Sequence, residues 1–211
     1  MRALVLMTLM TLVASAFMPS YVGEVACLVL RHSKVHDVLA PYERIIKLSA
    51  TQALELDVAD YHLTLLAYYR LAYDSMLHNR LEDCARYVGI MLTLMLKAKG
   101  YSEELGSQLL SILERLDWGS VRLYSDEPEK LIDYWLTYKP RSLEDLAYAY
   151  ASIALSLLEQ LPSDAFIRVL HTPKLRELYI ASLIMIVITS AYFVVKRVRA
   201  EGGGVRYEGY R

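Results

Sequence analysis

The two cysteines carry the most reactive side chains of this 211-residue chain. Cys27 and Cys84 are the only cysteines. Outside the cytoplasm such a pair can oxidise, and a disulfide between them would close a loop of about 57 residues. The chain-entropy model assigns that bridge roughly 4 kcal/mol of stabilisation. The alternative is two small, buried apolar side chains, and the spacing leaves both possibilities open.

His32 and His36 stand four positions apart on a predicted helix, close enough to hold one metal ion. No acidic residue lies between them, so the H-E-x-x-H pattern of metalloproteases is absent. Two ligands do not complete a site, and a third would have to come from elsewhere. We therefore treat His32 and His36 as weak metal candidates, and we expect an exposed helix face with no metal and no cofactor.

The remaining polar residues form no recognisable catalytic pattern. The sequence contains no G-x-S-x-G motif, no P-loop and no dinucleotide-binding fingerprint. Acidic pairs such as Glu144-Asp145 stand at the starts of predicted helices, where carboxylates stabilise the helix dipole. The sequence thus predicts no catalytic residue and favours a non-enzymatic protein. The alternative is an envelope enzyme or metal-dependent hydrolase without a known motif.

Tyrosine is abundant, with 17 residues against three phenylalanines. A tyrosine buries an apolar ring and satisfies its hydroxyl at an edge, which suits seams between helices. Aromatic surfaces also suit protein partners. One helix carries the candidate partner surface Tyr61, Tyr68, Tyr69 and Tyr73. Later helices carry further aromatic residues: Tyr134, Trp135, Tyr138, Tyr148 and Tyr150.

The segments that position these residues all have helical character. Ala, Leu, Glu and Arg are frequent, and alternating runs of β-branched residues are missing. Breaks and caps predict helices at 20–39, from Pro41 onward, from an Asp57 cap to 78, at 80–99, from a Ser102 cap to 118–119, from 125 or 126 to 139, from a Ser142 cap, at 163–170 and from Pro173. Since the connections are short, the sequence predicts an all-α fold, a multi-helix antiparallel bundle or helical-hairpin array.

The N-terminus has the layout of a secretory signal peptide. Arg2 precedes an uncharged run at residues 3–13, and the A-x-A pattern Ala14-Ser15-Ala16 follows. A helix over that run would reach about 16 Å, too short for a hydrocarbon core of about 30 Å. We expect residues 1–16 to be a signal peptide, with an uncleaved anchor as the alternative.

The C-terminal region predicts a transmembrane helix. Residues 178–195 carry no charge, and as a helix they would span about 27 Å. Tyr179 and Tyr192 lie near the two ends, where interfacial aromatic residues collect. The basic residues Lys196, Arg197 and Arg199 follow at once, as in a stop-transfer sequence that stays in the cytoplasm.

Charge and topology together predict a single-pass membrane protein. Residues 17–172 would form an extracytoplasmic helical domain, residues 173–195 would enter and span the bilayer, and residues 196–211 would be a short basic cytoplasmic tail. The net charge of the whole chain is −1, and its middle lacks the basic face that nucleic-acid binding requires. The expected partners are the lipid bilayer and one or more membrane or envelope proteins, so that the domain would act as an interaction or assembly module.

Overall fold

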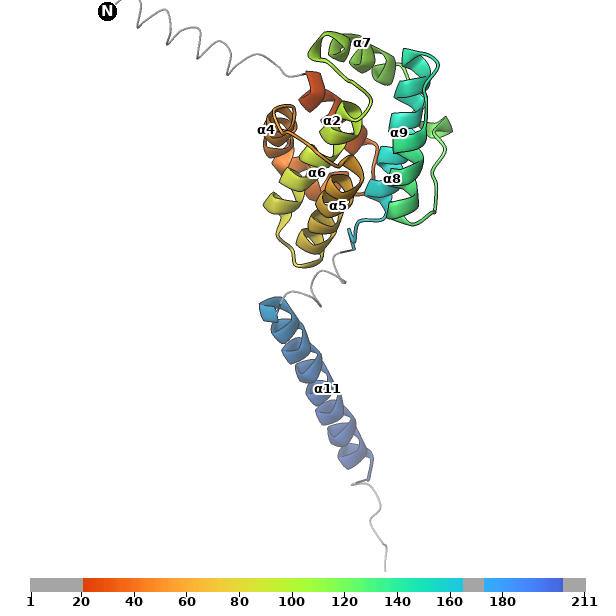
Figure 1. The fold of residues 1–211 in the computed structure, drawn as a ribbon. Helices are drawn as coiled ribbons and strands as arrows, with labels where there is room; N and C mark the ends of the chain where they lie inside the picture. Colours follow the sequence, from red (N-terminus) through yellow and green to blue (C-terminus); the bar gives the residue numbers. More distant parts are fainter. Residues whose placement is uncertain (1–20, 165–172, 203–211) are drawn as a thin grey trace, which may run out of the picture.

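The computed structural model describes residues 21–164 and 173–202. Within these ranges every regular element is a helix, so the predicted all-α fold is confirmed (Figure 1). The predicted signal peptide, residues 165–170 of the predicted helix at 163–170 and the end of the tail lie outside the described residues, whereas Ser163 and Asp164 are described and are not helical. The elements are α2 (Tyr21–Arg31), α3 (His36–Leu39), η1 (Ala40–Tyr42), α4 (Glu43–Ala53), α5 (Tyr61–Leu77), α6 (Leu81–Lys97), α7 (Glu103–Glu114), η2 (Trp118–Ser120), α8 (Pro128–Thr137), α9 (Leu143–Glu159) and α11 (Pro173–Gly202).

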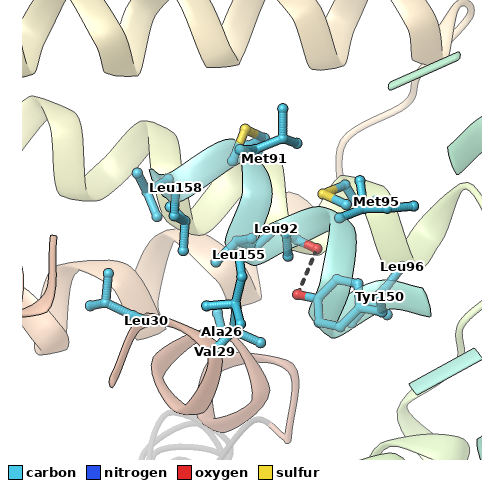
Figure 2. Close-up of a cluster of buried hydrophobic side chains, with 14 of the residues drawn as sticks. Ala26, Val29, Leu30, Met91, Leu92, Met95, Leu96, Tyr150, Leu155 and Leu158 are labelled. Carbon is cyan, nitrogen blue, oxygen red and sulfur yellow. Dashed lines mark hydrogen bonds between the residues drawn. The ribbon is translucent and has the colours of Figure 1, made fainter. Parts of the chain in front are cut away.

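Helix α6 forms the centre of the helical body. It packs mainly against α4 and α5, and it also contacts α2 and α9. Figure 2 shows the meeting point of α2, α6 and α9, where the buried side chains come from all three helices. They are Ala26, Val29 and Leu30 from α2, Met91, Leu92, Met95 and Leu96 from α6, and Tyr150, Leu155 and Leu158 from α9. Burial of these apolar surfaces is the main source of stability in such a body.

Local signals in the sequence correctly predicted several helix ends. Asn79 ends α5 with a positive φ of 58°, and Gly100 follows α6 with a φ of 74°, both in the left-handed region. Ser142 caps α9, since its Oγ accepts a hydrogen bond from the backbone N–H of Asp145 at 3.1 Å. Helix α11 begins at Pro173, as predicted.

The prediction of one continuous helix at 20–39 was wrong, because helix α2 ends at Arg31 and a new helix, α3, begins at His36. The Ser33 hydroxyl donates to Leu30 O at 2.7 Å, and the backbone N–H of Lys34 donates to a carboxylate oxygen of Glu159 at 2.7 Å. These bonds replace the regular helical pattern. The turn separates α2 from the short α3.

Three other predicted boundaries were also displaced. Helix α5 is capped by Asp60 rather than Asp57, and Asp60 Oδ1 accepts from Leu63 N at 3.0 Å. Helix α7 ends at Glu114, while Trp118 and Gly119 belong to η2. Helix α8 begins at Pro128, later than expected.

The contacts of two side chains hold α8 on the body: those of Trp135, which is buried, and those of Lys99, which is partly buried. Trp135 is fully buried, and its Nε1 donates to Met95 O of α6 at 2.8 Å. Lys99 Nζ donates to Leu136 O at 3.0 Å and to Tyr138 O at 2.6 Å, so it caps the end of α8. The ammonium group also lies 5.2 Å from the centroid of the Trp135 ring. Partial burial lowers the pKa of Lys99.

Helix α11 continues beyond the predicted span, to Gly202. Its side chains are described for residues 177–192. Among the described residues of the chain, no helix is long and apolar enough to cross a membrane. The membrane span at 178–195 is therefore not shown by the structure and stays a prediction.

Candidate functional site

The two cysteines lie in the core as separate thiols. Cys27 of α2 and Cys84 of α6 are both buried, and no disulfide joins them. The Cys27 thiol donates to the backbone oxygen of Glu43 at 3.8 Å. Burial raises the pKa of the Cys27 thiol to about 12. The structure thus places this pair as small buried side chains, the second of the two possibilities that the sequence left open.

The histidine pair sits at the break between α2 and α3 rather than on one continuous helix. The His32 ring stacks on Trp118 of η2, with centroids 4.2 Å apart and planes at 5°. His36 Nδ1 lies 3.7 Å from Asp37 Oδ1. Burial is the main cause that lowers the pKa of His32. No group of three His, Cys, Asp or Glu residues that could hold a metal ion occurs among the described residues.

The four tyrosines of the candidate partner surface on α5 do not share one exposed face. Tyr69 is buried, whereas Tyr73 is 40% exposed and its ring lies 6.4 Å from that of Tyr69. Tyr61 and Tyr68 are half-buried, and Tyr68 packs towards Tyr87 of α6. The outward side chains of α5 include Leu63 and Leu71 instead, at 63% and 43% exposure.

A different set of tyrosines surrounds a pocket between α8, α9 and the segment before α8. The pocket measures about 230 Å³. Its polar and aromatic lining comes from Tyr124, Tyr134, Tyr138, Asp145, Tyr148 and Ser152, and we call it the tyrosine pocket. In Figure 1, α8 and α9 lie at the edge of the body, and the two helices contact each other.

Contacts between the rings order one wall of the tyrosine pocket. The rings of Tyr124 and Tyr134 have centroids 6.1 Å apart at 47°, and those of Tyr134 and Tyr138 are 5.8 Å apart at 37°. Tyr134 belongs to α8, and Tyr138 directly follows the last residue of that helix, where its backbone N–H donates to Tyr134 O at 2.9 Å. Tyr124 comes from the irregular segment that follows η2 and is brought to α8 by the fold.

Hydrogen bonds position the opposite wall, which belongs to α9. The Tyr148 hydroxyl donates to Ser120 O at 3.1 Å and accepts from Arg122 N at 3.3 Å. Asp145 Oδ1 accepts from the Tyr138 hydroxyl, and Asp145 Oδ2 accepts from Arg141 N at 2.8 Å. The hydrogen bond from Tyr138 is the main cause that lowers the pKa of Asp145. These hydrogen bonds therefore favour the ionised form of the carboxylate.

Ser152 is the most deeply buried polar residue of the tyrosine pocket. It is 1% exposed. Its Oγ has no hydrogen-bond partner in the part of the chain that the structure describes. A buried hydroxyl without a partner is uncommon, because its desolvation is not compensated.

A second, wider depression adjoins the tyrosine pocket. It measures about 580 Å³ and shares Asp145 and Tyr148 with the tyrosine pocket. Three carboxylates line it, those of Asp117, Glu144 and Asp145, together with one guanidinium, that of Arg115. The sequence indicated only that Glu144 and Asp145 begin a helix. Their position beside four tyrosines depends on how α8, α9 and the intervening segments pack.

Helix α11 presents apolar side chains in every direction. Each residue from 180 to 192 is exposed. The large apolar side chains among them include the consecutive run Leu183, Ile184, Met185, Ile186, Val187 and Ile188. Six consecutive helical residues cover all directions around the axis at 3.6 residues per turn. The side chains of the predicted stop-transfer residues Lys196, Arg197 and Arg199 lie outside the described residues.

Comparison of the chain with protein-family models, with curated proteins and with solved structures finds no match.

Proposed function

We propose that the chain is a membrane-anchored, extracytoplasmic helical module that serves in the assembly of an envelope complex. The observation that carries this proposal is the exposure of α11. Its apolar side chains are exposed around the whole helix, with Val187 at 66% and Leu178 at 65%. A helix that is apolar on all sides is stable only when an apolar environment surrounds it, and a bilayer supplies that environment.

The sequence that follows residue 192 supports the anchor. The described side chains of α11 end at residue 192, whereas the uncharged run continues to residue 195. Three basic residues follow within the next four positions and favour a cytoplasmic end: Lys196, Arg197 and Arg199.

Two of the three serine and threonine side chains within the apolar run, those of Ser182 and Thr189, have local partners. Ser182 Oγ donates to Leu178 O at 2.8 Å, and Thr189 Oγ1 donates to Met185 O at 2.7 Å. Such bonds to the preceding turn reduce the cost of placing a hydroxyl in hydrocarbon.

The assembly role is supported by the outward side of α5. Leu63 is largely exposed, and Leu71 and Tyr73 are partly exposed. The inner face of the same helix packs on α6 and α8. Exposed apolar and aromatic side chains of this kind suit contact with another protein.

Membrane extraction tests the anchor. The full chain should remain in the membrane fraction after an alkaline wash. The double variant Ile184→Lys/Ile188→Lys should be released, because each lysine costs roughly 3 kcal/mol at the centre of a bilayer. Ile184→Leu/Ile188→Leu is the matched control and should remain bound. Release of the unchanged protein by the same wash would overturn the anchor.

Co-purification in mild detergent tests the assembly role. The native protein should return stoichiometric partners, and Leu63→Glu should lose them. Leu48→Glu is the matched control, because Leu48 has a similar exposure of 60% but lies on α4. Recovery of an isolated monomer from the native membrane would count against the role.

Protease treatment of intact cells tests the topology. The protease should cleave the helical body, and protection of that body would contradict its extracytoplasmic location.

A further inference from the structure

We propose that the tyrosine pocket binds a small organic ammonium ion. This binding activity goes beyond the proposed anchoring and assembly role and does not depend on it. The pocket combines four tyrosine rings, one carboxylate and one buried hydroxyl. Aromatic rings attract cations through the negative potential of their faces, and rings that surround a cavity are the usual recognition element for alkylated ammonium groups.

The ring arrangement suits a cation more than a flat aromatic ligand. Neighbouring rings are tilted by 47° and 37° rather than stacked in parallel, so they form a bent wall. Tyr138 is held by its hydrogen bond to Asp145, and Tyr148 is held by its bonds to Ser120 and to the backbone N–H of Arg122. A wall that is ordered before binding loses little conformational freedom when the ligand arrives.

Asp145 supplies the charge that a cation requires. Its two oxygens accept the bonds from Tyr138 and Arg141 described above. Each carboxylate oxygen can accept more than one bond, so capacity remains for an ammonium group. Asp117 and Glu144 add negative charge in the adjoining depression.

Basic residues nearby oppose this charge only in part. Arg115 lines the adjoining depression, and Arg141 lies close enough to act on the pKa of Asp145. The guanidinium carbon of Arg122 lies 5.2 Å from the centroid of the Tyr124 ring. The Arg122 guanidinium thus already occupies part of the Tyr124 ring, so the rings of Tyr134, Tyr138 and Tyr148 are the ones proposed to contact the ligand.

The size of the tyrosine pocket limits the ligand. A volume of about 230 Å³ lies below the range of drug-sized ligand sites. A compact head group such as trimethylammonium matches this volume better than a peptide or a nucleotide does. A longer substituent on the ligand would extend into the wider depression past Asp145 and Tyr148, which belong to both.

Titration of the full-length protein in mild detergent with choline, followed by tyrosine and tryptophan fluorescence, tests the proposal. We expect saturable binding of choline. The uncharged isostere 3,3-dimethylbutanol should bind at least tenfold more weakly, because it lacks the charge that the rings and Asp145 recognise. Equal binding of the two compounds would overturn the proposal, and so would the absence of saturable binding by both choline and tetramethylammonium.

Variants locate the binding at the tyrosine pocket. Tyr134→Ala and Asp145→Asn should each weaken choline binding about tenfold. Tyr73→Ala is the matched control, because Tyr73 has a similar exposure to Tyr134 but lies on α5. Circular dichroism identifies any variant that fails to fold, and Tyr134→Phe, which retains a ring, should retain binding in a folded protein. Unchanged affinity in folded Tyr134→Ala and Asp145→Asn would overturn the assignment.

A titration with glycerophosphocholine in place of choline distinguishes a lipid head group from a free cation.

Discussion

Gly89 of α6 lies so close to Ser49 of α4 that a Cβ on the glycine would come within 2.3 Å of Ser49 Oγ. The same Cβ would lie 2.6 Å from the backbone oxygen of Ile46. The absence of a side chain at Gly89 therefore permits the close approach of α4 and α6. That contact is among the most extensive in the helical body.

Gly89→Ala should destabilise the protein by about 1–3 kcal/mol, because the extra methyl group forces the two helices apart. Urea unfolding of the full chain in mild detergent measures this change. Gly119→Ala is the control, since the nearest neighbour of its Cβ would be an Asp117 oxygen at 3.4 Å. Adding Ser49→Gly should restore only part of the loss, because the Ile46 backbone remains. Equal stability of Gly89→Ala and the native protein would contradict the close approach.

Lys99→Met should destabilise the protein by about 2 kcal/mol. The substitution keeps most of the apolar stem but removes the donor to Leu136 O and Tyr138 O, leaving partly buried carbonyls without that partner. Thermal or urea unfolding measures the loss. Lys130→Met is the matched control, because the Lys130 side chain is 68% exposed, and it should change stability by less than about 0.5 kcal/mol. Similar losses in both variants would contradict the capping role of Lys99.

The thiols of Cys27 and Cys84 should not react with a thiol reagent in the folded protein. Both side chains are 0% exposed, and the raised pKa of Cys27 leaves little thiolate at neutral pH. Titration with a chromogenic disulfide should detect two thiols only after denaturation. Cys27→Ala and Cys84→Ala should each reduce that number to one. Absence of thiols in the denatured, unreduced protein would show that a disulfide had formed.

Stability should fall below about pH 4 partly through Asp145. Its folded pKa is lowered, first by the hydrogen bond from Tyr138 and then by that from Arg141 N. The ionised carboxylate therefore contributes stability above its unfolded pKa, and this contribution is lost as the pH falls through the lower folded value. Asp145→Asn should show a smaller loss over this range, in unfolding measurements at a series of pH values. Glu144→Gln is the neighbouring control, and an equal acid loss in Asp145→Asn and the native protein would contradict the role of Asp145.

Local sequence signals determined the helical class and several helix ends. Asn79 and Gly100 stop helices because they adopt positive φ readily, Ser142 caps α9 through its own hydroxyl, and Pro173 starts α11 with a suitable backbone angle. Each of these effects acts within about one helical turn, so neighbouring residues suffice to predict it. The apolar and basic pattern at the C-terminus likewise supports the anchor proposal by composition alone.

Contacts between segments that are distant in sequence decided the break after Arg31, the surroundings of the cysteines and the tyrosine pocket. The break after Arg31 is stabilised partly by Glu159, which is 125 positions from Lys34 in the chain. The Cys27 thiol contacts the backbone oxygen of Glu43, 16 positions along the chain, a partner that cysteine spacing does not reveal. The tyrosine pocket required Tyr124, Tyr138 and Tyr148 to converge from different elements around Asp145. Side-chain directions across helix interfaces depend on packing and on the exact ends of helices, so only the tertiary structure brought these groups together.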